Sequence, residues 1–143
     1  MVQKHPRWVQ AILLYFTLAN SLPGIWAFFM PVDFYSHFPG FGHSWVAVDG
    51  PYNEHLIRDV GAFFLAFTGL SSLALFAPHT VTARAVAISL LLFNIPHLWY
   101  HVQHLHMLSV ADQIGNVVTL SLSVLLLIPL LFYKPHLVQP QHA

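Results

Sequence analysis

The stretch VAISLLLFNIPHLWYHVQHLH, residues 86–106, decides the fold, because its first half belongs to an apolar run long enough to cross a bilayer. Its second half carries Asn94, His97, His101 and His104 at positions i, i+3, i+7 and i+10. In a helix, with about 100° per residue, these four side chains fall within roughly a quarter of the circumference. Polar groups are costly at membrane depth, so this face is expected to point into a helix bundle and to mark a functional site.

The composition is typical of an integral membrane protein. Of the 143 residues, 57% are hydrophobic and 7% are charged, whereas about a quarter of the residues are charged in an average soluble domain. The formal net charge is zero with neutral histidines, so no basic surface for nucleic acid is expected. Eleven histidines and no cysteine mean that a bound metal ion would need nitrogen and oxygen ligands.

Four apolar runs predict an all-α fold, a four-helix transmembrane bundle that forms a single domain over residues 1–143. The first run is longer than the apolar region of a signal peptide, which has about 7 to 15 residues, so we interpret it as a retained helix. A long aromatic connection, residues 31–54, follows it and is expected to lie at the headgroup level and to cap the bundle. The predicted helices cover about residues 9–30, 54–76, 82–104 and 112–133.

The charged residues predict the orientation in the membrane. Lys4, Arg7, Arg84 and Lys134 flank helix ends that lie on one side of a chain with four spans, while the acidic residues lie towards the other side. The positive-inside rule therefore places both termini in the cytoplasm and the aromatic loop outside. We expect a multi-pass protein of the plasma (inner) membrane.

This topology is expected to bring three polar sets together in the outer half of the bilayer, at the start of the second helix, the end of the third and the start of the fourth. Two pairs at spacing i, i+4 predict a metal site, because residues one turn apart can reach the same ion. The predicted metal ligands are His55, Asp59, His97 and His101. The predicted residues that bind or orient a further ligand are Arg58, Asn94, Asp112 and Asn116.

Three kinds of ligand fit this predicted pocket. A transition metal ion, such as zinc, iron or copper, suits imidazole and carboxylate ligands. Haem would take His97 or His101 together with His55 as axial ligands between helices. A quinone-like or other lipophilic molecule would form hydrogen bonds with His and Asp side chains and stack on Phe and Trp. The residues alone leave the metal and the lipophilic molecule as equal alternatives.

Residues 53–70, NEHLIRDVGAFFLAFTGL, resemble the second helix of the DoxX-like four-helix membrane proteins, which begin that helix with an acidic residue and an arginine, followed by small residues, Leu and Gly. Glu54, Arg58 and Gly61 stand at the family-like positions. The layout of four spans and the long first outer loop are also similar. The better-known members resemble quinone-linked oxidoreductase subunits, so the resemblance implies a ligand-binding or redox role. The family motif does not include residues 94–106.

We therefore expect a small membrane protein whose outer-leaflet pocket binds a metal or a quinone-like ligand, with a redox-linked role. The alternative is a non-catalytic accessory subunit whose polar face seals against the helices of a membrane-protein partner or of a second copy. The lipid bilayer surrounds the chain in either case. Catalytic residues and a substrate do not follow from the sequence, which also leaves open whether the protein is an enzyme.

Overall fold

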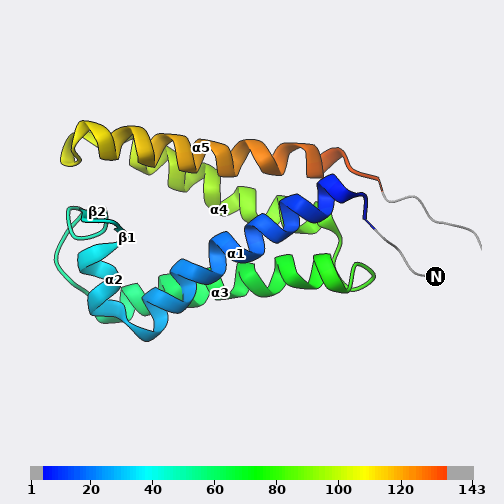
Figure 1. The fold of residues 1–143 in the computed structure, drawn as a ribbon, viewed down its shortest axis with the longest axis horizontal. Helices are drawn as coiled ribbons and strands as arrows, with labels where there is room; N and C mark the ends of the chain where they lie inside the picture. The colour runs from blue at the N-terminus through cyan, green and yellow to red at the C-terminus, as the bar shows by residue number, and fades with distance from the viewer. Residues whose placement is uncertain (1–4, 135–143) are drawn as a thin grey trace, which may run out of the picture.

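The computed structural model describes residues 5–134, and the main feature of this part of the chain is a set of four long helices (Figure 1). All four are long and apolar enough to cross a membrane, which confirms the predicted spans. Their ends lie close to the predicted ones. The long helices are α1 (Arg7–Phe29), α3 (Glu54–Phe76), α4 (Ala83–Gln103) and α5 (Val110–Phe132).

Side-chain caps explain where three of these helices begin. The Asn53 side chain accepts a hydrogen bond from the backbone N–H of Leu56 and so caps α3. Thr82 caps α4 and Ser109 caps α5 in the same way. Each cap satisfies a backbone donor that the first helical turn would otherwise leave without a partner. Pro23 lies inside α1 and Pro96 lies inside α4, and both helices continue past these prolines.

The four long helices form two pairs. Helix α1 packs along α3, and α4 packs along α5. Figure 1 shows that the pairs meet at one end, where α1 and α4 begin and where α3 and α5 end, and that they spread apart at the other end. The larger hydrophobic core lies where the pairs meet. Its buried residues are Val9, Leu13, Phe16, Ala74, Ala83, Val86, Ala87, Leu90, Leu91, Leu127 and Leu130.

Two glycines allow α1 and α3 to approach closely. A Cβ atom on Gly61 would lie 2.5 Å from the backbone nitrogen of Phe28, and one on Gly24 would lie 3.0 Å from the backbone nitrogen of Leu65. Membrane helices associate through such close packing of small residues, because the bilayer provides no hydrophobic force that would hold two apolar helices together. The α1–α3 pair is therefore held by close backbone contact near the end where the two pairs diverge.

The connection between α1 and α3, which was expected to be a long aromatic loop, is a folded segment. It contains helix α2 (Pro31–His37) and a short antiparallel hairpin of β1 (Pro39–Gly40) and β2 (His43–Ser44). Gly40 and Gly42 provide positive φ angles of 99° and 83° in this hairpin. Residues 45–48, after the hairpin, form bends and turns and belong to neither a helix nor a strand. A 3-10 turn, η1 (Leu105–Met107), connects α4 to α5.

Helix α2 and the hairpin occupy the end at which the two helix pairs diverge (Figure 1). A second hydrophobic cluster anchors them there, with Ala27, Phe34 and Ile57 buried and Trp26 and Phe38 packed against them. The fold therefore has one end where the pairs share a hydrophobic core and a second end where a folded segment covers the space between them. That second end is where the functional site is to be sought.

Candidate functional site

A cavity of about 530 Å³ lies between the two helix pairs, at the end covered by α2 and the hairpin. Side chains from all four long helices, from α2 and from residues 45–53 line it. The lining is mainly apolar and rich in aromatic rings. The aromatic lining residues are Tyr15, Phe16, Phe34, Tyr35, Phe38, Trp45, Phe64, Phe93 and Tyr100.

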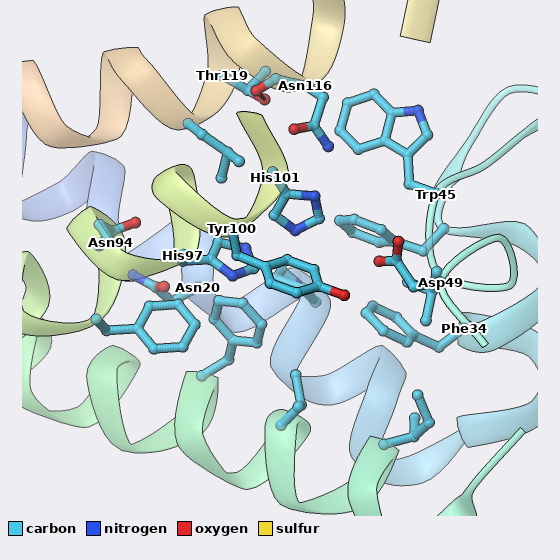
Figure 2. Close-up of a pocket in the computed structure, with 18 of the residues that line it drawn as sticks. Asn20, Phe34, Trp45, Asp49, Asn94, His97, Tyr100, His101, Asn116 and Thr119 are labelled. Carbon is cyan, nitrogen blue, oxygen red and sulfur yellow. Dashed lines mark hydrogen bonds between the residues drawn. The ribbon is translucent and has the colours of Figure 1, made fainter. Parts of the chain in front are cut away.

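Polar side chains from three helices reach this cavity (Figure 2). Asn20 comes from α1, Asn116 comes from α5, and α4 contributes Asn94, His97 and His101. His104, the fourth residue of the predicted polar face, is the C-cap of α4 and does not line the cavity. Asn20 and Asn116 are buried, with 8% and 2% of their surface exposed. Because amide groups are costly to bury away from water, their convergence on one space indicates a site for a molecule that can form hydrogen bonds.

The two α4 histidines are held by aromatic contacts. The His97 ring stacks on Phe93, with 5.0 Å between the ring centroids and an angle of 22° between the planes. His101 meets the His97 ring edge-on at 4.6 Å, and Tyr100 meets His101 edge-on at 5.7 Å. The i, i+4 spacing places both imidazoles on one side of α4. They can donate and accept hydrogen bonds, and two ring nitrogens one turn apart could also bind one ion.

Trp45 crosses from the α1–α3 side of the cavity to α5. Its indole Nε1 donates a 2.8 Å hydrogen bond to Oδ1 of Asp112. Its ring packs over Gly115, where an added Cβ atom would lie 3.2 Å from the indole. The same Asp112 oxygen lies 2.6 Å from Nδ1 of His43, and Ser109 donates to the other carboxylate oxygen at 2.6 Å. Asp112 therefore anchors the hairpin to the start of α5.

The polar residues at the start of α3 contact one another at the surface. Arg58 pairs with Glu54 at 2.8 Å, and its guanidinium also donates to the backbone carbonyl of Phe28 at the end of α1. His55 lies 3.3 Å from Asp59, and 88% of the His55 side chain is exposed. The Arg58 contact joins α3 to α1. None of these four side chains lines the cavity.

The structure thus divides the eight predicted site residues. Asn94, His97, His101 and Asn116 line the cavity, whereas His55, Arg58, Asp59 and Asp112 do not. Within residues 5–134 no group of three or more His, Asp or Glu side chains that could hold a metal ion is found, and the predicted metal site stays a prediction. His55, the predicted second axial ligand of a haem, does not line the cavity, whereas His97 does.

Several cavity residues were not among the predicted site residues. Asn20 is one of them, and its signal in the sequence is an amide side chain within an apolar span. Tyr100 lies inside the histidine-rich stretch, but its ring was not assigned to the polar face. Trp45 and Asp49 reach the cavity because the connection folds back, and no local pattern in residues 31–54 indicates this.

Comparison with protein-family models, with curated proteins and with solved structures finds no match for this chain.

Proposed function

We propose that this membrane protein binds a small lipophilic molecule with a ring, such as a quinone, in the cavity between its helix pairs. One observation carries the proposal. A cavity of about 530 Å³ has an aromatic lining and polar groups from three helices, among them Asn20, His97 and Asn116. Sites for small organic molecules usually have about 300 to 1,000 Å³, an apolar lining and a few polar groups that orient the ligand.

The aromatic rings and the histidines have different tasks in this proposal. Phe34, Phe38 and Phe93 provide flat apolar surface against which a ring can pack. His97 and His101 each offer one N–H donor and one acceptor nitrogen when neutral, so they can hold the oxygen substituents of the ring. The ligand would thus be bound by its apolar area and oriented by the histidines.

The predicted orientation places the cavity towards the outer face of the membrane, beneath α2 and the hairpin. A lipophilic ligand would then partition first into the outer leaflet. The predicted resemblance to DoxX-like proteins is compatible with this ligand class, because some of those proteins resemble quinone-linked subunits. Membership of that family stays a prediction. A redox-linked role follows only if the bound molecule is a quinone.

The test uses the full chain in lipid nanodiscs and decylubiquinone as the probe, with binding measured by isothermal titration calorimetry. We expect saturable binding by the unmodified chain. The double variant His97→Ala, His101→Ala should bind about tenfold more weakly or worse, because it loses two hydrogen bonds of about 1 kcal/mol each as well as ring contacts. His55→Ala is the matched control, since this histidine is exposed and does not line the cavity.

Equal binding by all three proteins would contradict the proposal. Native mass spectrometry of the purified protein provides a second readout, in which an organic molecule should be retained and should be lost in the double variant. A larger assembly that retains no small molecule would favour the alternative of an accessory subunit instead.

A further inference from the structure

One carboxylate belongs to the lining of the cavity, that of Asp49. The chain has five acidic residues, and all of them lie at the end where the helix pairs diverge, namely Asp33, Asp49, Glu54, Asp59 and Asp112. Within residues 5–134, Asp49 is the only one of the five that lines the cavity, and no lysine or arginine lines it. The described lining therefore carries one acidic group and no permanently basic one.

Asp49 also differs from the other four acidic residues in its contacts. In the part of the chain that the structure describes, each of the other four has a histidine or an arginine within 3.3 Å, as the pairs Asp33–His37, Glu54–Arg58, Asp59–His55 and Asp112–His43. Asp49 has no such partner among residues 5–134. A carboxylate accepts hydrogen bonds and attracts cations, so this one is left for solvent or for a ligand.

Two hydrogen bonds fix the backbone around Asp49. Its own N–H donates to the Val46 carbonyl at 3.1 Å, and the Tyr35 hydroxyl donates to the carbonyl of the next residue, Gly50, at 2.8 Å. Figure 2 shows the Asp49 carboxylate turned from this loop toward the side on which Tyr100 and His101 lie. Asp49 is an exposed residue, so its carboxylate can stay ionised and a ligand can reach it. The negative charge therefore has a defined place at the loop end of the cavity.

Aromatic rings line the same end. Phe34, Phe38 and Trp45 form a row, with 4.7 Å between the ring centroids of the first two and 6.2 Å between those of the last two. Tyr35 and Tyr100 also contribute to the lining. The face of an aromatic ring is electronegative and attracts a cation, and rings of this kind recognise quaternary ammonium groups in proteins.

We infer that the cavity takes a lipophilic molecule that carries a cationic amine or quaternary ammonium group, with this group held by Asp49. The inference rests on the proposed function and adds the charge of the ligand. The cation would lie at the loop end, and the apolar part would extend toward Phe93 and His97. A neutral quinone can fill the apolar part, but its oxygens only accept and would leave the carboxylate without a partner.

The test compares three aromatic probes that differ in charge: 4-hexylphenyltrimethylammonium, its neutral isostere 1-tert-butyl-4-hexylbenzene, and 4-hexylbenzoate. Binding to the full chain is measured by calorimetry in a non-ionic maltoside detergent, because choline headgroups would compete with the cation. Affinities are corrected for partition of each probe into empty micelles. The buffer is kept at pH 8, above the ordinary histidine pKa of about 6.5, so that a charged imidazole does not contribute.

We expect the cation to bind about tenfold more tightly than the neutral isostere, because attraction to the carboxylate and the rings adds to the apolar contact. The benzoate should bind most weakly, since its charge repels that of Asp49. Asp49→Asn should abolish the preference for the cation over the isostere. This variant keeps the shape of the side chain, and none of the hydrogen bonds around Asp49 uses its carboxylate.

Asp59→Asn is the matched control. It removes the same charge at the same end of the bundle, but Asp59 does not line the cavity. This control should keep the full preference for the cation. An equal loss of preference in Asp49→Asn and Asp59→Asn would overturn the assignment to Asp49, because the effect would then come from the overall charge of this end.

Decylubiquinone serves as a fourth probe that separates the two proposals. Equal affinities for the cation and its isostere, or binding of decylubiquinone without binding of the cation, would overturn the inference and leave the proposed function standing. A failure of all four probes to bind would overturn both.

Discussion

The indole Nε1 of Trp45 donates a 2.8 Å hydrogen bond to Oδ1 of Asp112, which joins the segment between α1 and α3 to the first turn of α5. The two residues are 67 positions apart in the chain. Trp45 lines the cavity, whereas Asp112 lies behind it. This bond therefore connects the two helix pairs at the end where they diverge, and it holds one wall of the cavity in place.

Replacing Asp112 by alanine should loosen the hairpin, because the carboxylate accepts from Trp45 and pairs with His43. We expect amide hydrogen exchange in residues 39–46 to become about tenfold faster. Glu54→Ala is the control, since it breaks only an exposed ion pair with Arg58 and should leave this exchange unchanged.

Gly61→Ala should destabilise the α1–α3 pair. The added Cβ would lie 2.5 Å from the backbone nitrogen of Phe28 and 3.0 Å from the carbonyl carbon of Ala27, and backbone cannot move aside as a side chain can. We expect a lower midpoint of thermal unfolding in detergent. Gly69→Ala in the same helix meets no atom within 4 Å, so it should be neutral or slightly stabilising, as alanine is the better helix former by about 1 kcal/mol. Equal midpoints for the two variants would contradict this packing.

Asn116→Leu should stabilise the ligand-free protein while weakening ligand binding. The substitution removes a buried oxygen that has no hydrogen-bond partner within residues 5–134, and leaving such an oxygen unpaired costs about 1 to 3 kcal/mol. Ser71→Ala is the matched comparison, because the Ser71 hydroxyl is also buried with no hydrogen-bond partner in the described part of the chain, but it lies outside the cavity. It should raise the unfolding midpoint and leave binding unchanged. Loss of binding in both variants would mean that the effect is not local to the cavity.

His5 ties the start of the described chain to the packed end of the bundle. It is 5% exposed, its Nε2 lies 3.0 Å from the Ala74 carbonyl, and its Nδ1 lies 3.3 Å from the Tyr133 hydroxyl. We expect His5→Ala to lower the stability by about 2 kcal/mol or more, and Tyr133→Phe to lower it by less, because only one bond is lost. His79→Ala, at an exposed turn position, should have no effect on thermal unfolding.

The sequence-based prediction of a metal site can be tested separately. His97 and His101 could supply two nitrogens, but residues 5–134 bring no third His, Asp or Glu to them. We expect elemental analysis to find the same low zinc, iron and copper content in the unmodified protein and in the double variant His97→Ala, His101→Ala. Near-stoichiometric metal that is lost in the double variant would contradict the proposal of an organic ligand and would support the metal site.

The sequence by itself determined the four spans and the polar face of α4. Apolar length predicts a membrane helix because every backbone polar group must be satisfied inside the segment. The spacing of Asn94, His97 and His101 predicts a shared face because it depends only on helix geometry. All three line the cavity.

Only the tertiary structure decided which other polar groups meet that face. Asp112 and Asn116 are one turn apart on α5, yet Asp112 holds the hairpin and Asn116 lines the cavity. His55 and Asp59 have the same i, i+4 spacing as His97 and His101, yet they remain on the surface. Periodicity predicts only on which side of its own helix a residue lies. Which residues of other helices lie next to it depends on tertiary contacts, such as the close approach of α1 and α3 at Gly61 and the contact of Trp45 with α5.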